Sequence, residues 1–222
     1  MPKRLTCIPD PPDLASDLTR IDIAQIQDGC SSSAVSVLDA DLAGVGARSL
    51  TVEGSLIERA DLGNARLPGV RLLDTRLRGC NLANMQARGA SLTRCEIDGC
   101  RLTGSSWAES RFNNVLIKDC RLDLSVFTHA TLEWVTFERC LMTSSDLQEA
   151  RCDSVCLHAC DLTDCDTSGA RFRRSELRGC ELTGLHGVES LRGISMEWDD
   201  LVGLMPALAR AFGIGVLAPP GS

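Results

Sequence analysis

The sequence contains no tyrosine, and only three tryptophans and five phenylalanines occur among its 222 residues. Because 44% of the residues are hydrophobic, a core must be built mostly from small and aliphatic side chains. No apolar run approaches the roughly 20 residues that a membrane-spanning helix needs. The phosphate-binding loop of P-loop proteins, the dinucleotide-binding glycine motif and the GxSxG nucleophile motif are also absent. We therefore predict neither a membrane protein nor an enzyme.

The N-terminal residues and the charge balance bear on where the protein acts. Residues 1–7 lack the apolar stretch of a secretory signal, so we expect a cytoplasmic protein whose cysteines stay reduced. The net charge of −7 disfavours a charge-driven grip on phosphates, so no direct binding to nucleic acid is predicted.

A repeat of five residues organises most of the chain. Of the 29 positions that end in 2 or 7 between Leu42 and Leu182, 25 carry a large hydrophobic side chain. The positions two residues earlier carry Ala, Cys, Ser, Thr or Val in 27 of 29 cases. Neither an α-helix nor a β-strand has a period of five. Each quintet is therefore predicted to point one large and one small side chain inward.

Each quintet also has a position that favours a turn. Two residues after the large hydrophobic side chain, Gly, Asn or Asp occurs in 16 of 29 quintets. These residues tolerate backbone angles that others avoid, which predicts a tight corner at this position. Trp134 occupies one such corner and is expected to be partly exposed, whereas Trp107 and the phenylalanines at 112, 127 and 137 occupy the large inward position.

Quintets such as residues 60–64 (ADLGN) and 80–84 (CNLAN) resemble the pentapeptide-repeat family. The resemblance implies an all-β solenoid, namely a right-handed quadrilateral parallel β-helix with four quintets per coil. A coil of four quintets fits the column of cysteines that recurs at every fourth quintet from Cys80 to Cys180. Residues 40–184 would form about seven coils, a rod roughly 35 Å long at about 4.8 Å per coil. The predicted core includes Leu62, Cys80, Leu82, Cys100, Leu102, Phe112, Cys120, Leu122, Phe127, Phe137, Cys140, Cys160 and Leu162.

The extent of the repeat suggests three segments. Residues 30–187 are predicted to form the pentapeptide-repeat β-helix, in which residues 30–37 fit the repeat only loosely. Residues 1–29 are predicted to be an N-terminal arm and cap, because an uncovered first coil would present open strand edges. Residues 188–222 are predicted to be a helical and strand-forming segment that caps the other end.

The C-terminal segment carries a helical pattern. Ser195 is expected to be the N-cap, and Pro206 to kink the helix or divide it in two. Ile214, Val216 and Leu217 are expected to form a final strand. The apolar stripe at helical spacing consists of Leu201, Leu204, Met205, Leu208 and Phe212. One interpretation is a lid over the last coil, and the other is a surface that also pairs two rods.

The runs 191–198 (LRGISMEW) and 204–216 are similar to the C-terminal segment of Qnr and MfpA-type pentapeptide-repeat proteins. That segment caps the solenoid and joins two rods end to end, so the resemblance implies a homodimer. Proteins of this type bind DNA gyrase and related type II topoisomerases as DNA mimics and protect them from poisons such as quinolones. The implied partner is therefore a type II topoisomerase and the implied role antibiotic or self-resistance. The alternative is a pentapeptide-repeat scaffold for another protein.

Charge is distributed unevenly over the four predicted faces. The third face consists of the quintet that starts at residue 50 and of every fourth quintet beyond it. This face is net positive, with Arg71, Arg94, Arg111, Arg151, Arg171, Arg173 and Arg174. The first and second faces start at residues 40 and 45 in the same way and should share an acidic ridge in the C-terminal half. The ridge consists of Asp123, Asp146, Glu149, Asp161, Asp164, Asp166 and Glu181. It could steer a DNA-binding partner, or the mixed charges could only keep the rod soluble.

The twelve cysteines and three histidines predict neither a metal site nor a cofactor. Eight cysteines occupy the small inward position, and the zinc-binding spacing CxxC does not occur. Cys7 and Cys156 are expected to be the most exposed thiols. His129, His158 and His186 occupy different positions in their quintets and are expected to point outward as ordinary polar residues.

Overall fold

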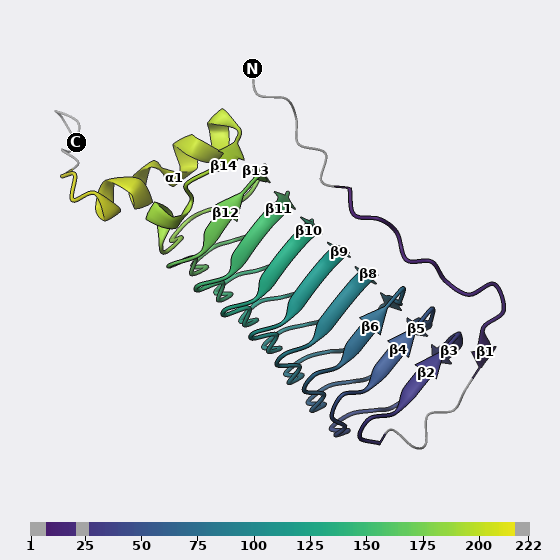
Figure 1. Cartoon of the computed structure of the whole chain (residues 1–222). Coiled ribbons are helices and arrows are strands. Elements are labelled where there is room, and N and C mark those ends of the chain that lie inside the picture. The colour runs from purple at the N-terminus through teal and green to yellow at the C-terminus, as the bar shows by residue number, and fades with distance from the viewer. Residues whose placement is uncertain (1–7, 21–26, 216–222) are drawn as a thin grey trace.

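The structure, a computed structural model, describes residues 8–20 and 27–215. These residues form a parallel β-solenoid of about nine turns with one helix at its C-terminal end (Figure 1), which confirms the predicted β-helix and its helical cap. The first turns are formed by residues that fit the repeat loosely, so the rod is longer than the seven coils counted from residues 40–184.

The strands are short in the first and last coils and longer in the middle of the rod. They are β1 Thr19–Arg20, β2 Ser31–Ser33, β3 Val35–Leu38, β4 Thr51–Glu53, β5 Leu56–Glu58, β6 Arg71–Leu73, β7 Arg76–Arg78, β8 Ser91–Asp98, β9 Arg111–Lys118, β10 Thr131–Glu138, β11 Arg151–His158, β12 Arg171–Arg173, β13 Ser175–Arg178 and β14 Ile194–Met196. A 3-10 helix, η1, spans Val188–Ser190, and the helix α1 spans Trp198–Ala211.

Within the coils, parallel pairing joins residues that are exactly one coil of four quintets apart in the chain. Thr131 pairs with Arg151 between β10 and β11, and the other strands of the coils keep the same offset. The long strands β8–β11 cover the third and fourth faces. On the first and second faces, successive coils are joined by isolated β-bridges, such as that between Asp41 and Asp61. The offset differs only for the end strands, where Thr19 pairs with Val35 and Ser175 with Ile194. Because it is constant from β2 to β13, side chains of one column lie on the same face over this part of the rod.

The corners have the predicted backbone conformation. Every fifth residue from Ala34 to Gly184 has a positive φ, whether or not it is glycine. Trp134, at such a corner, has a φ of 55° and is 44% exposed, as expected. Hydrogen bonds between coils hold the corners, as when the Asn64 amide donates to the carbonyl of Ala83.

The interior is a continuous apolar core. All thirteen residues predicted for the core are buried. In the middle of the rod, four aromatic rings pack in series, with centroid separations of 5.7 Å for Trp107–Phe112, 5.8 Å for Phe112–Phe127 and 6.2 Å for Phe127–Phe137. The indole of Trp107 also donates to the hydroxyl of Ser105 at 2.8 Å, so its polar atom is satisfied.

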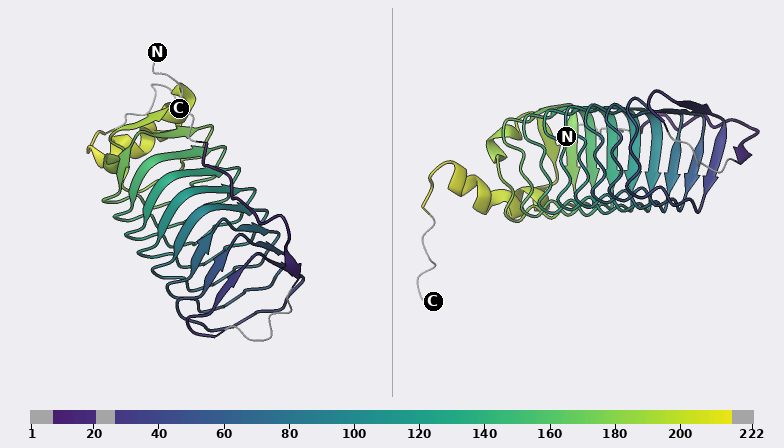
Figure 2. Two further views of the ribbon diagram at one scale, coloured as in Figure 1. Left: turned by 45° about the vertical axis from the view of Figure 1, so that its right-hand side comes forward. Right: turned by 90° about the horizontal axis from the view of Figure 1, so that it is seen from below.

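The described part of the N-terminal segment covers one end of the solenoid and then runs along its side. β1 pairs in parallel with β3 at the start of the rod. Residues 8–18, which precede β1, lie along the corner between the third and fourth faces (Figures 1 and 2). Their amides donate to that corner, from Ala15 to the Gly54 carbonyl and from Asp13 to the Asp74 carboxylate. We call residues 8–18 the arm.

The start of the C-terminal helix differs from the prediction. Ser195 is not the N-cap, because it lies in β14 and pairs with Glu176 of β13. The helix begins at Trp198, and Glu197 takes the N-cap position. A strand-pairing partner in the preceding coil therefore overrides the local capping preference of serine.

The rest of the segment also departs from expectation. Pro206 lies inside a single helix, because proline removes only one helical hydrogen bond and buried Leu204 and Ala207 hold the helix against the rod. Ile214 is not in a strand, and Val216 and Leu217 lie outside the described residues.

Candidate protein-interaction surface

The acidic ridge lies where the register places it, on the first and second faces of the C-terminal half. Asp146 bridges to Asp166, and Asp161 bridges to Glu181, so these carboxylates stack on neighbouring coils. Glu149 and Asp164 occupy corners of the same two faces, with φ of 56° and 55°. All of the ridge residues, including Asp123, are exposed or half-buried.

Most of the ridge carries no local counter-charge. Asp123 has an arginine 3.6 Å away, so it contributes less negative charge than predicted. Among the described residues, the other six ridge carboxylates have no ion pair. Many acids elsewhere on the rod are paired, as in the pairs of Asp119 with Arg139 at 2.7 Å and Glu96 with Arg76 at 2.7 Å. In the part of the chain that the structure describes, the acids of the rod without an ion pair outside the ridge are more scattered, such as Asp41, Glu58 and Glu133. The ridge is thus a site of uncompensated negative charge.

Hydrogen bonds favour the ionised form of three ridge carboxylates, Asp161, Asp166 and Glu181. The hydroxyl and amide of Thr163 lower the pKa of Asp161, and those of Thr183 lower the pKa of Glu181. Burial opposes ionisation of Asp166, but hydrogen bonds from Ser168 and Gln148 outweigh it, so the pKa of Asp166 is also lowered. These groups therefore stay charged at neutral pH, and stacking between coils keeps them close together.

The C-terminal helix presents two different faces. Asp200, Leu204 and Ala207 are buried against the rod. Of the stripe predicted from the sequence, Leu201 and Leu208 are half-buried, whereas Met205 and Phe212 are 58% and 67% exposed. The outer apolar face also contains Trp198 and Val202, which the sequence analysis did not select. Val202 follows Trp198 by four positions, and Met205 follows Val202 by three. This helical spacing forms a second apolar stripe, which is the sequence signal that could have identified the outer face.

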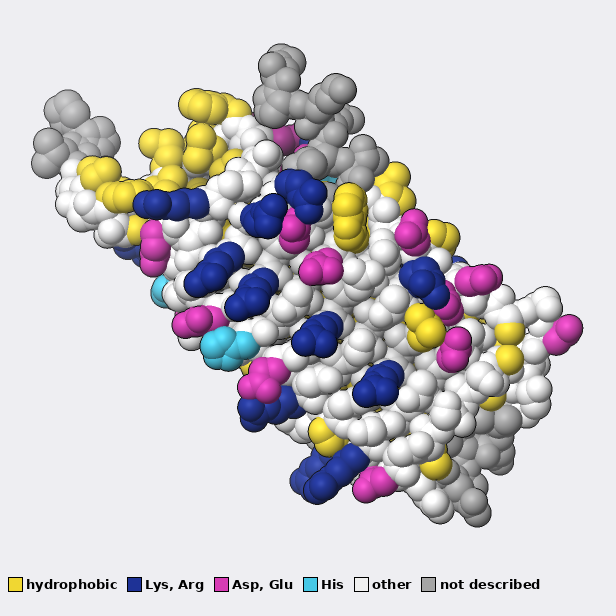
Figure 3. Space-filling view, in the orientation of Figure 1, with side chains coloured by type: hydrophobic (Ala, Val, Ile, Leu, Met, Phe, Trp, Pro, Cys, Tyr) yellow, Lys and Arg dark blue, Asp and Glu magenta, His cyan; other side chains and the backbone are white. Residues whose placement is uncertain are grey.

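The third face shows a row of basic side chains that runs along the rod, across successive strands (Figure 3). Arg71, Arg111, Arg151 and Arg171 occupy one column of that face, and all four are exposed. Arg94 and Arg174 are paired instead, with Asp74 and Asp153. The predicted positive face is therefore partly neutralised and partly open to solvent.

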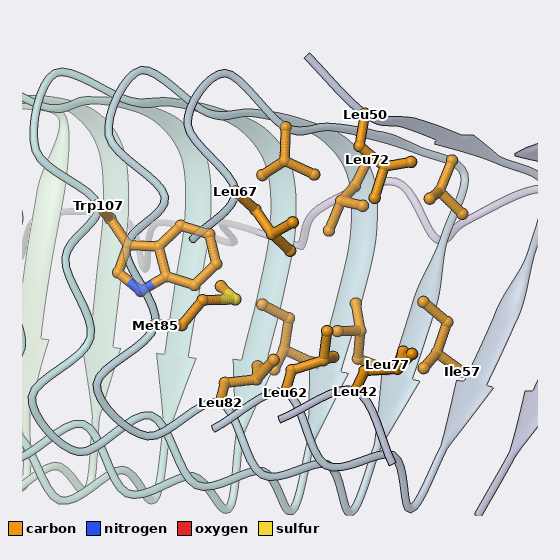
Figure 4. Close-up of a pocket in the computed structure, with 13 residues that line it drawn as sticks. Leu42, Leu50, Ile57, Leu62, Leu67, Leu72, Leu77, Leu82, Met85 and Trp107 are labelled. Carbon is orange, nitrogen blue, oxygen red and sulfur yellow. The ribbon is translucent and has the colours of Figure 1, made fainter. Parts of the chain in front are cut away.

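An enclosed space in the interior of the rod is too small for a usual ligand. A cavity of about 60 Å³ lies in the N-terminal half, lined only by apolar side chains such as Leu62, Leu72 and Met85 (Figure 4). Ligand pockets usually hold about 300–1,000 Å³. The wall is apolar, and the one N–H group on a lining side chain, that of Trp107, is already bonded to Ser105, so the wall supplies no free polar group for recognition.

The thiols and imidazoles form no metal-binding cluster among the described residues. No group of three or more His, Cys, Asp or Glu side chains there is placed to hold a metal ion. Burial raises the pKa of Cys95 and of Cys152 to about 12, so these thiols stay protonated. His158 lies 3.3 Å from the Glu176 carboxylate, while His129 and His186 are exposed.

One prediction about the thiols is wrong. Cys156 is fully buried, because its neighbours in the column, Thr136 and Glu176, flank a side chain that is too short to reach past them. Cys7, the other thiol expected to be exposed, lies outside the described residues.

The described part of the chain contains no helix that is long and apolar enough to cross a membrane.

Two protein-family models match parts of the chain. The one for a pentapeptide repeat region matches residues 90–164, and the one for pentapeptide repeats matches residues 57–94 and 156–185. Together they cover the rod from residue 57 to residue 185, in the same register as the corners and columns above. The chain is a pentapeptide-repeat protein. No curated protein matches this pentapeptide-repeat chain.

Several solved structures are similar to parts of this chain. A trypsin-treated form of QnrB1, described as a plasmid-mediated fluoroquinolone resistance protein, is 18% identical with a TM-score of 0.46, and the match covers 83% of this chain and 99% of that one. HetL, involved in heterocyst differentiation regulation in the cyanobacterium Nostoc, is 19% identical with a TM-score of 0.39, covering 76% and 90%. A thylakoid-lumen protein of Arabidopsis thaliana is 21% identical with a TM-score of 0.30, covering 47% and 64%.

Proposed function

We propose that this pentapeptide-repeat protein is a non-catalytic binding rod that occupies the DNA-binding surface of a type II topoisomerase such as DNA gyrase, and protects the enzyme from inhibitors. The observation that carries the proposal is the acidic ridge. Six carboxylates without ion pairs gather on two adjoining faces, whereas many other acids of the rod, such as Glu96, Asp74 and Asp119, are paired with arginines. A concentrated field of this kind attracts a basic, DNA-binding surface even when the net charge of the rod is small.

The stacking of the ridge supports mimicry of a phosphate backbone. Bridged carboxylates lie on successive coils, about 4.8 Å apart, and the rigid ladder keeps them from spreading under their own repulsion. A DNA-binding surface recognises DNA mainly through repeated negative charge, which this arrangement supplies without bases. We also propose that the protein acts in the cytoplasm and that its role is antibiotic resistance or self-resistance.

The test is a gyrase supercoiling assay in the presence of a quinolone, with isosteric removal of charge. The variant D146N/E149Q/D161N/D164N keeps side-chain acceptors for the turn hydrogen bonds, such as that from the Gln148 amide to Asp146. We expect the unchanged protein to restore supercoiling at micromolar concentration and this variant to lose most of that protection. The control D17N/D41N/E53Q/E58Q removes the same charge outside the ridge and should still protect. Protection by the ridge variant, or none by the unchanged protein, would refute the proposal.

We further propose that the outer apolar face of α1 pairs with the same face of a second copy. A second copy is the expected partner because this face lies at the end of the rod. Across a two-fold axis, the exposed side chains would pack against the same side chains of that copy, namely Trp198, Val202, Met205 and Phe212. These residues are 47–75% exposed in the single chain, which is costly for large apolar side chains gathered on one short helix.

The oligomeric state tests this pairing. We expect a dimer by analytical ultracentrifugation and a monomer for W198D/M205D. The control L124D/L141D places the same charges at exposed leucines on the side of the rod and should remain dimeric. A monomeric unchanged protein would refute the pairing without bearing on the ridge.

The alternative function is a scaffold that binds another protein. It is favoured by the basic row on the third face, because a duplex has no such surface. That row leads to a separate inference.

A further inference from the structure

The third face carries a regular row of arginines that lack acidic partners. The row follows one outward column along successive coils, with hydroxyl side chains between the arginines. In chain order the column reads Thr51, Arg71, Ser91, Arg111, Thr131, Arg151 and Arg171. Among the described residues, none of the four arginines has an ion pair, and all four are exposed.

The acids of the same face leave this charge in place. Asp153 is engaged by Arg174 at 2.7 Å and lies 3.9 Å from Arg173. Glu133 is exposed and accepts a hydrogen bond from Asn113 at 3.2 Å. The row therefore remains a positive strip, weakened locally at Glu133 and also flanked by Glu53 near its beginning.

The spacing of the row fits an extended peptide. Arg71, Arg111 and Arg151 lie on alternate coils, so neighbours in this set are about 9.6 Å apart along the rod, twice the spacing of β-strands. Three residues of a polyproline II chain span about 9.3 Å. An extended chain that runs along the rod therefore places every third side chain opposite one of these arginines.

At the neighbouring corner, the arm shows the same match between three residues of an extended chain and two coils of the rod. The amides of Asp10 and Asp13, three residues apart, donate to Asn114 and Asp74, which lie two coils apart. The pKa of Arg94 between them is raised, first by its hydrogen bond with Asp74 and more weakly by the charges of Asp13 and Asp10. The rod thus holds an extended Asp-Pro-Pro-Asp segment with three residues matched to two coils.

We propose that the row Arg71, Arg111 and Arg151 is a docking surface for an extended acidic segment of a partner protein, with Asp or Glu at every third residue. Charge complementarity and the matched spacing carry the proposal. The surface lies opposite the first face, so it is independent of the acidic ridge and of gyrase binding.

Two synthetic peptides of identical composition test the spacing. One repeats Asp-Pro-Pro, so that its acids are three residues apart, and the other groups the same acids together. Binding to the full chain is measured by fluorescence anisotropy at about 0.01 M ionic strength, where the Debye length is about 30 Å. We expect the spaced peptide to bind about ten-fold more tightly, the combined effect of three exposed ion pairs.

Matched variants locate the site. R71T/R111T/R151T should abolish the preference for the spaced peptide, and threonine is already present in this column at Thr51 and Thr131. R48T/R66T/R101T makes the same change in net charge on the first and second faces and should retain the preference. E133Q should strengthen binding about two-fold by removing the nearest acid. Thermal unfolding checks that each variant is folded.

Three outcomes would overturn the proposal. Equal binding of the two peptides, or equal loss in the two triple variants, would show only bulk attraction. Tighter binding of a short DNA duplex that depends on the same three arginines would assign the row to nucleic acid. Because gyrase protection is measured separately, failure here leaves the proposed function of the ridge untouched.

Discussion

At the scale of single residues, the corner position dominates this fold. Glycine accepts a positive φ at little cost, but most corners from Ala34 to Gly184 carry other residues, including Leu124 at 60° and Trp134 at 55°. For an L-residue this conformation costs roughly 1–2 kcal/mol. The strain is tolerated because hydrogen bonds between coils hold the corner, as when the Leu124 amide donates to the carbonyl of Thr143 at 3.0 Å.

The first prediction is that Leu124→Asn stabilises the protein. Asparagine is more compatible with a positive φ than leucine, and Leu124 is 60% exposed, so little buried area is lost. We expect the free energy of unfolding to rise by about 0.5–1 kcal/mol in chemical denaturation. Leu141→Asn is the control, because Leu141 is on the same face and 43% exposed but is not at a corner. An equal gain in both variants would show that loss of an exposed leucine, not relief of strain, is the cause.

The residue scale also shows what the sequence could predict. The five-residue period identified the inward positions because each column repeats the same chemistry. It also identified the corner, since Gly, Asn and Asp are frequent there. Burial of Cys156 was missed, because it depends on the side chains of adjacent coils rather than on its position in its own quintet.

At the scale of elements, the end of the rod depends on one carboxylate. Asp200 of α1 accepts hydrogen bonds from the amides of Gly179 and Cys180, each at 3.0 Å. In earlier coils the equivalent amides bond to the following coil, as when the Gly79 amide donates to the Asp98 carbonyl. The buried carboxylate therefore substitutes for a coil that does not exist. The sequence pattern does not reveal this role of Asp200, because the partners of its carboxylate lie a whole coil earlier in the chain.

The second prediction is that Asp200→Ala destabilises the C-terminal end. Removal of both acceptors leaves the amides of half-buried Cys180 and exposed Gly179 without protein partners, and the loss at Cys180 alone costs about 1–3 kcal/mol. We expect a lower melting temperature and faster hydrogen exchange at Gly179 and Cys180 than at amides of the middle coils. Asp199→Ala is the matched control, since Asp199 is exposed and precedes Asp200 in the same helix. If the two variants exchange alike at these amides, Asp200 does not cap the coil.

At the scale of the whole molecule, the constant register explains which parts of the site were predictable. The period of four quintets placed the acids on two faces and the arginines on a third, because columns never change sides. The period did not show which charges are neutralised. Glu96 and Asp119 are paired across coils, whereas Asp146 and Asp161 are not, and this difference depends on side-chain reach between neighbouring coils. Likewise, the helical stripe predicted a cap but did not separate its inner and outer faces.

The whole rod is also packed unevenly along its length. Aromatic rings fill the interior from Trp107 to Phe137, whereas the coils before them contain only aliphatic side chains around the 60 Å³ cavity (Figure 4). A void of this kind forfeits dispersion contacts on the side chains that line it. Sequence alone shows the scarcity of aromatics in the first coils, but the size of the gap depends on how the leucines of facing columns meet.

The third prediction therefore compares the same substitution at two places in one column. Leu62 lines the cavity and Leu122 lies in the fully packed middle of the rod, three coils further along. Phenylalanine at position 62 should fill part of the void and raise the free energy of unfolding by about 0.5–2 kcal/mol. At position 122 the added ring has no space and should cost about 1–3 kcal/mol. Urea denaturation measures both changes against the unchanged protein. Because the two sites share one column and one type of residue, opposite signs would establish that local packing, rather than strand propensity, limits the stability of the first coils, and equal signs would contradict it.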